Sequence, residues 1–128
     1  MNYKRLIPCI FIYQGKAVKW FDNLEILSDD VVKLAKKYND MGADELLVFD
    51  LSTTDEEHDH AIDLMKKMNR VIRIPMVAGG NIRRQEDVKK ILYTGAKRAI
   101  LNFSKALSVE LIVAIMATAA QAQIYVGG

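Results

Sequence analysis

The chain has 128 residues, of which 51% are hydrophobic and 27% charged, as is typical of one globular domain that buries a core. This composition excludes disordered and collagen-like chains. The formal net charge of +2, from 18 Lys+Arg against 16 Asp+Glu, is too balanced for a protein that mainly neutralises nucleic-acid phosphates. We therefore expect a small molecule or a protein as the partner, and no nucleic acid.

Short apolar runs alternate with segments of helical period, which predicts four βα units on a parallel sheet. The first strand is expected at Leu6–Ile12 and is followed by a long loop, Tyr13–Leu27. A helix then begins at the polar cluster Ser28–Asp30 and ends near Gly42, which supplies a left-handed residue.

The second unit is predicted from a strand at Leu46–Phe49, followed by Thr54 and Glu57, which have the spacing of a capping box. The helix that they open is expected to run to about Asn69. The third strand is expected at Ile72–Ala78, since Pro75 is tolerated near the start of a strand.

The next helix is expected to open within Asn81–Gln85 and to end at Gly95. A fourth strand at Ala99–Leu101, a helix capped by Ser108 and the start of a fifth strand at Ile124–Val126 complete the pattern. Since no linker rich in Pro, Gly or Ser interrupts it, we predict a single domain over residues 1–128. The run Gly42–Val48 recurs as Gly95–Leu101, which supports a repetitive βα architecture, although such joints are common in α/β proteins.

The longest uncharged run, Leu111–Gly128, approaches the length of a membrane span, but polar residues interrupt it and its end has the pattern of a strand. We therefore expect no membrane association. The apolar run near the N-terminus is too short for a signal peptide, and the one cysteine, Cys9, cannot form an intrachain disulfide. These features predict a cytoplasmic protein, with Cys9 as a packed thiol in the first strand.

The carboxyl ends of parallel strands form the reactive face of such folds, so the residues there are the first candidates for a site. Gly79 and Gly80 follow the third strand, and Asn102 and Ser104 follow the fourth. Glycines let an anion approach backbone N–H groups and a helix N-terminus adds positive charge, so these residues are predicted to bind phosphate. The alternative for the two glycines is a plain tight turn.

Two further residues at this face carry charge. Asp50 ends an apolar strand, where a carboxylate needs a partner or a task. Lys19, in the long first loop, is placed to contact an anionic ligand, with a solvated lysine as the alternative. His58 and His60 are two positions apart on a helix and point to different faces, so we expect no metal site and no cofactor.

The opposite end of the sheet carries a second group of charges. Arg5, Glu45 and Arg98 each precede a strand and are expected to converge there in a salt-bridged plug. At the amino ends of the strands, such a cluster indicates stability or a partner contact rather than chemistry.

Taken in order and at this spacing, five segments of the chain resemble the cyclase subunit of imidazole glycerol phosphate synthase. The related sugar-isomerase branch of histidine biosynthesis shares several of them. The segments are Lys4–Cys9, Gly15–Lys19, Asp44–Asp50, Ile74–Gly80 and Gly95–Asn102. That family is a (βα)₈ TIM barrel of two similar halves, so the resemblance implies an α/β fold, the parallel (βα)₄ N-terminal half plus the start of a fifth strand.

The resemblance also implies roles. It places Gly80 and Asn102 in a phosphate site and Lys19 and Asp50 in the active site of a lyase. It further makes the Arg5, Glu45 and Arg98 cluster a gate for ammonia from a glutaminase subunit. In the family, ammonia and a phosphoribosyl compound become imidazole glycerol phosphate and an aminoimidazole carboxamide ribotide.

The sequence departs from the family at the residues that transfer protons. Phe11 stands where the family has its first catalytic aspartate, and the chain ends at Gly128, just before the second. Phenylalanine cannot transfer a proton, so we expect these residues to be inactive alone. Phe103 also replaces a small hydroxyl residue, which weakens the phosphate site.

A half-barrel exposes strand edges and the open side of its core, so we expect a homo-oligomer or pairing with a C-terminal half. The segment 108–122, whose one charge is Glu110, is a second expected contact surface. Two alternatives remain. One is an active enzyme on phosphoribosyl ligands in a longer protein, with Asp50 as its base, and the other is a non-catalytic interaction module.

Overall fold

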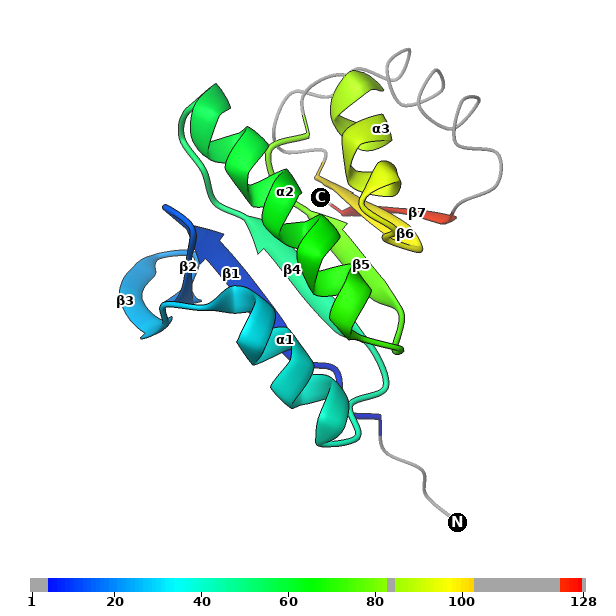
Figure 1. The fold of residues 1–128 in the computed structure, drawn as a ribbon. Helices are drawn as coiled ribbons and strands as arrows, with labels where there is room; N and C mark the ends of the chain where they lie inside the picture. Colours follow the sequence, from blue (N-terminus) through cyan, green and yellow to red (C-terminus); the bar gives the residue numbers. More distant parts are fainter. Residues whose placement is uncertain (1–4, 83–84, 103–122, 128) are drawn as a thin grey trace.

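The computed structural model describes residues 5–82, 85–102 and 123–127, which form a seven-stranded sheet and three helices (Figure 1). In chain order the elements are β1 (Cys9–Tyr13), β2 (Lys16–Trp20), β3 (Asn23–Ser28), α1 (Val31–Asp40), β4 (Leu46–Asp50), α2 (Asp55–Val71), β5 (Met76–Gly79), α3 (Gln85–Tyr93), β6 (Arg98–Asn102) and β7 (Gln123–Gly127).

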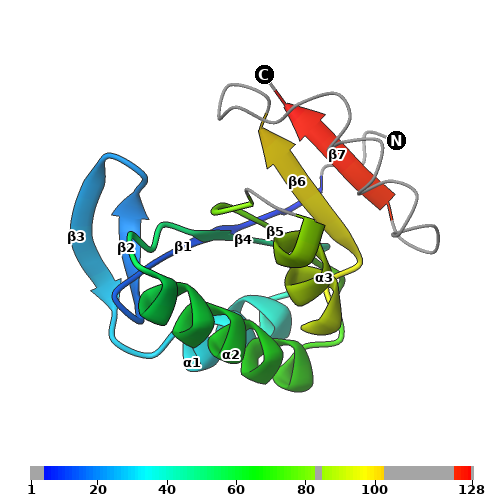
Figure 2. The same ribbon diagram turned by 90° about the horizontal axis from the view of Figure 1, so that it is seen from above.

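The strands of the sheet lie in the order β3-β2-β1-β4-β5-β6-β7. Five of them, β1, β4, β5, β6 and β7, are parallel and adjacent in chain order. The sheet is curved, and the three helices cover its convex side (Figure 2). This confirms the α/β fold of a partial TIM barrel, with β7 as the predicted fifth strand.

Helices α1 and α2 begin at the residues that the sequence predicts as their caps. Asp30 caps α1 by accepting a hydrogen bond from the Lys33 N–H at 3.0 Å. At α2 the Thr54 hydroxyl accepts from the Glu57 N–H at 3.1 Å, and the Glu57 carboxylate accepts from the Thr53 N–H at 3.1 Å. The bonds from Lys33 and Glu57 satisfy backbone donors that the first helical turn leaves unpaired, and the bond from Thr53 holds the residue before the cap.

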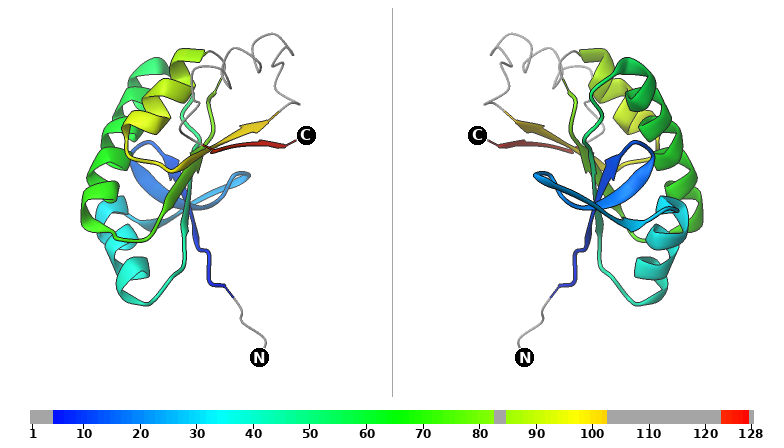
Figure 3. Two further views of the ribbon diagram at one scale, coloured as in Figure 1. Left: turned by 90° about the vertical axis from the view of Figure 1, so that its right-hand side faces the viewer. Right: turned by 90° about the vertical axis from the view of Figure 1, so that its left-hand side faces the viewer.

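The main core lies between the sheet and the helices (Figure 3). Successive side chains of a strand point to opposite faces, and alternate residues of β1 and β4 enter this core. Among the buried apolar side chains of the core are Ile10, Ile12, Leu46, Val48, Met65, Met68, Met76 and Ile91. The residues between them therefore lie on the concave face.

The prediction of a loop over Tyr13–Leu27 was wrong, because this segment forms the hairpin of β2 and β3. β2 pairs antiparallel with β1, and the connecting residues Gln14 and Gly15 both have positive φ, at 50° and 77°. Two left-handed residues give a turn whose twist matches the strands of a hairpin. All of β3 is exposed except the half-buried Ser28, although its first four residues, Asn23–Ile26, alternate between polar and apolar as a strand does.

Two strand starts also differ from the prediction. β1 begins at Cys9 rather than Leu6, and β5 begins at Met76, directly after Pro75. Proline has no N–H to donate, which suits this position before the paired residues. Cys9 is exposed on the concave face, so the expectation of a packed thiol was wrong.

No helix among the described residues is long and apolar enough to cross a membrane. The helix predicted from Ser108 lies outside the described residues, as do Phe103 and Ser104.

Before β4 and β6, the repeated glycines Gly42 and Gly95 have matching φ values of 91° and 98°.

Gly80 follows β5 and brings it close to the end of β4. Its φ is 89°, and a Cβ at this position would collide with the backbone carbonyl of Asp50. Only glycine permits both the left-handed backbone and this approach.

We expect Gly80→Ala to lower the free energy of unfolding by about 2 kcal/mol or more, because it adds a collision to the strain of a positive φ. Gly42→Ala is the control, since φ there is 91° but no atom lies within 4 Å of an added Cβ. The control should lose only about 1 kcal/mol. Urea unfolding measures both, and equal losses would show that the collision relaxes.

Candidate functional site

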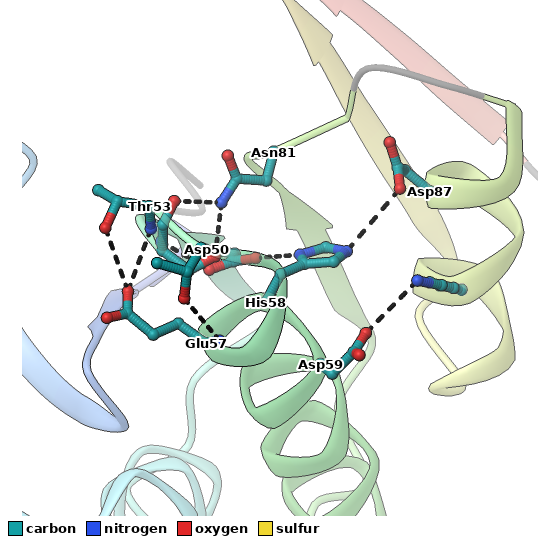
Figure 4. Close-up of polar contacts among 10 residues, drawn as sticks. Asp50, Thr53, Glu57, His58, Asp59, Asn81 and Asp87 are labelled. Atoms are coloured by element: carbon teal, nitrogen blue, oxygen red, sulfur yellow. Dashed lines mark hydrogen bonds and ion pairs between the residues drawn. The ribbon is translucent and has the colours of Figure 1, made fainter.

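A cavity of about 230 Å³ lies at the carboxyl ends of β4 and β5, where parallel α/β folds place their ligands. Its lining comes from the loop after β4, the first turn of α2, the residue after Gly80 and the helix α3 (Figure 4). The lining residues are Ser52, Thr53, Thr54, Asp55, His58, Asn81 and Asp87.

Asp50, the last residue of β4, is 2% exposed and both of its carboxylate oxygens are engaged. Oδ2 lies 2.5 Å from Nδ1 of His58, and Oδ1 accepts from the Ser52 N–H at 2.9 Å. The carboxylate therefore lies under α2, where it orients His58.

His58 is 6% exposed and lies between two carboxylates (Figure 4). Its Nε2 is 3.9 Å from Oδ1 of Asp87 and has no hydrogen-bond partner among the described residues. The hydrogen bond to Asp50 raises the pKa of His58 above its ordinary 6.5, and the charges of Asp50 and Asp87 act in the same direction. These effects exceed the opposing effect of burial, so the imidazolium form is stabilised.

Asn81 links the loops that follow the two strands. It has a positive φ of 53°, and its Nδ2 donates to the backbone oxygen and the hydroxyl of Ser52, both at 2.6 Å. Asparagine tolerates the left-handed conformation better than most residues, which explains its place directly after Gly80.

The residues predicted to bind phosphate lie at the carboxyl edge, as far as they are described. Gly79 ends β5 and Gly80 follows it, while Asn102 ends β6 beside Gly127 of β7. Ser104 lies outside the described residues. The close approach of the Gly80 backbone to Asp50 explains why a glycine stands at this position without any ligand. Its part in phosphate binding therefore stays a prediction.

Lys19 lies in different surroundings from Asp50. It belongs to the exposed hairpin, where its Nζ lies 3.9 Å from the Glu25 carboxylate of β3. Asp50 is buried between β4 and α2, so the two predicted catalytic side chains face different parts of the fold.

The charges predicted to meet at the amino ends of the strands do so. The Glu45 side chain, 9% exposed, has one oxygen 2.6 Å from the Arg98 guanidinium and the other 3.3 Å from that of Arg5. The predicted ion-paired cluster is confirmed, whereas its role as a gate stays a prediction.

The sequence analysis did not identify His58, Asn81 and Asp87 as residues of one site. His58 was considered only with His60 as a metal pair, and among the described residues no group of three or more His, Cys, Asp or Glu is arranged to hold a metal ion. The available signal was its position four residues after the cap Thr54, which turns it back toward the end of the preceding strand.

Comparison with known proteins identifies one family model and several relatives that match most of this chain. A family model described as "Histidine biosynthesis protein" matches residues 5–127. The chain is 40% identical over 114 residues to the imidazole glycerol phosphate synthase subunit HisF of Exiguobacterium sibiricum, covering 88% of this chain and 45% of that protein. The subunit of the same name from Methanococcus vannielii is 40% identical over 113 residues, with 88% and 42% covered. The chain thus spans less than half the length of these relatives.

We expect protonated His58 to stabilise the fold at low pH. Its folded pKa is raised, so this stabilisation is complete below the unfolded value of 6.5 and is lost as the pH rises through the folded pKa. Urea unfolding from about pH 6 to 9 should therefore show a His58→Gln deficit that shrinks with rising pH. His60→Gln, at an exposed position, is the control. A deficit that does not change with pH would contradict this expectation.

Proposed function

We propose that this chain, which belongs to the histidine biosynthesis protein family, forms one N-terminal half-barrel domain of the imidazole glycerol phosphate synthase cyclase type. Its ligand is a phosphoribosyl-type small molecule or phosphate, bound at the carboxyl ends of the strands. These residues alone do not turn the ligand over.

The observation that carries this proposal is the surroundings of Phe11. Its ring stacks on Phe49, with centroids 5.4 Å apart and planes 17° apart, and lies 5.0 Å from the ring of Trp20. Phe11 is on the concave face, since its neighbours Ile10 and Ile12 enter the core under the helices. An apolar cluster thus fills the position where the resemblance implies a proton-transferring aspartate.

The proposed anion site uses backbone N–H groups after Gly79 and Gly80, together with Asn102 and Ser104. What supports it is the position of the first three at one edge of the sheet, where β5 and β6 are adjacent. Lys19 of the hairpin is the proposed cation for the ligand's phosphate.

At the opposite edge, the proposed partner is a glutaminase subunit that delivers ammonia. The relatives are themselves named as subunits of a synthase. Glu45, held by Arg5 and Arg98, is the proposed gate residue, because a buried carboxylate between two guanidinium groups can exchange partners without becoming unpaired.

The concave face is proposed to pair with a second copy of this chain or with a C-terminal half-barrel. Cys9 is exposed on this face, and Leu47, Phe49 and Ile100 are half-buried there. Apolar side chains of this kind are covered in a closed barrel.

A second candidate function is a non-catalytic interaction module. The hairpin favours it, because five large apolar side chains there are between 45% and 61% exposed. They are Trp20, Phe21, Leu24, Ile26 and Leu27.

We expect no ammonia-dependent cyclisation by the unaltered chain above the uncatalysed rate, because Phe11 cannot transfer a proton. Phe11→Leu, the apolar control, should be equally inactive, while Phe11→Asp should gain at most about a hundredfold, because it restores one of the two proton-transferring positions. The assay follows formation of the imidazole product. Turnover by the unaltered chain that persists in Phe11→Leu would overturn the proposal, whether or not Phe11→Asp folds.

We expect sedimentation equilibrium to show a dimer that dissociates on dilution, because the concave face needs a cover. Leu47→Lys places a charge on that face and should shift the equilibrium toward monomer. Tyr93→Lys, on α3 and 79% exposed, is the matched control and should leave it unchanged. A stable monomer of the unaltered chain would favour the C-terminal half as the cover.

A further inference from the structure

The buried Nε2 of His58 requires a partner that the described residues do not supply. Buried polar groups in folded proteins are nearly always hydrogen-bonded, because an unpaired one keeps its full desolvation cost. This nitrogen belongs to a side chain that lines the 230 Å³ cavity, so a molecule in the cavity is the available partner.

The protonation of the His58 imidazole decides whether the partner must accept or donate a hydrogen bond at Nε2. Asp50 accepts from Nδ1, and in the protonated ring, which the raised pKa favours, Nε2 carries a hydrogen to donate. Oδ1 of Asp87, 3.9 Å away, is beyond hydrogen-bond distance. A hydroxyl oxygen beside this gap can accept from Nε2–H and donate its own hydrogen to Asp87.

The remainder of the lining also suits hydroxyl groups. Ser52, Thr53 and Thr54 contribute hydroxyls, which both donate and accept, and Asn81 contributes an amide. Asn81 Nδ2 is engaged with Ser52 and the Thr54 hydroxyl accepts from Glu57, so the hydroxyl hydrogens of Ser52 and Thr54 and the Asn81 carbonyl are the groups left for a molecule with several hydroxyls.

The charge near the cavity disfavours an anion. The first turn of α2 would ordinarily attract one, but in this chain it carries three carboxylates, Asp55, Glu56 and Glu57. Among the described residues, Asp50 and Asp87 face the charge of His58, and Lys90 adds a positive charge near it. A neutral ligand avoids the repulsion that a phosphate would meet.

The volume of the cavity limits the size of the ligand. It corresponds to roughly seven or eight water molecules at about 30 Å³ each. This is room for one small sugar or polyol.

We propose that the cavity between β4, α2 and α3 binds a neutral, polyhydroxylated small molecule of sugar or polyol type, with His58 as the central donor and Asp87 as an acceptor. This site is distinct from the anion site proposed above, which uses Gly80 and Asn102.

The test uses the two histidines of the chain as internal reporters. D-ribose is titrated into the full chain while the imidazole Hε1 resonances are followed by NMR. The signal of His58 should shift saturably, whereas that of the exposed His60 should not. By calorimetry, His58→Gln should bind ribose about tenfold more weakly, the effect of one lost hydrogen bond, and His60→Gln should bind it unchanged.

The second arm compares ribose with ribose 5-phosphate. Tighter binding of the neutral sugar at the His58 signal supports the proposal, and tighter binding of the phosphorylated sugar overturns it. Equal shifts at both histidines, or no shift up to the solubility limit of ribose, would also overturn it and leave water as the content of the cavity. The anion site is tested separately by Asn102→Ala, which should weaken binding of inorganic phosphate and not of ribose.

Discussion

The contact between the Asp50 carboxylate and the His58 imidazole joins the carboxyl end of β4 to the first turn of α2. Two further contacts lie beside this pair of side chains. The backbone of Gly80 lies against Asp50, and Asn81 then reaches Ser52 by two hydrogen bonds. The ends of two strands and the start of one helix are thereby held in one arrangement. The cavity has its shape because these segments cannot move independently.

Most of the parallel sheet could be predicted because its units repeat a local pattern. Buried strands such as Leu46–Asp50 are apolar, and caps such as Thr54 have local chemistry that does not depend on distant contacts. The hairpin could not be predicted in the same way. Its outer strand β3 is almost wholly exposed and is held by pairing with β2, so the short alternation of Asn23–Ile26 is not supported by burial against a core.

The functional sites also divide into features that the sequence pattern predicts and features that depend on tertiary contacts. The meeting of Arg5, Glu45 and Arg98 follows from three strand starts in a parallel sheet, and topology alone predicts it. The cavity depends on which side of the strand end Asp50 faces, and on the approach of α3 with Asp87. The direction of Asp50 and the approach of α3 are both set by tertiary packing. A partnered carboxylate was expected at position 50, but its partner is eight residues away on a helix and could not be named from spacing alone.

The antiparallel strand β2 has a consequence for how the wall of a barrel is completed. It pairs with the carboxyl-terminal half of β1, from Phe11 to Tyr13, and so uses the backbone groups on that half of the edge. A strand from any other half-barrel that adds to β1 meets free backbone groups only toward Cys9. The seam between two halves is therefore short at β1, whereas β7, paired through Gln123–Gly127 with β6, offers its whole outer edge within the described residues. In a twofold pair of this chain both seams would join β1 of one copy to β7 of the other, so the short free edge of β1 would limit the backbone pairing at each seam alike.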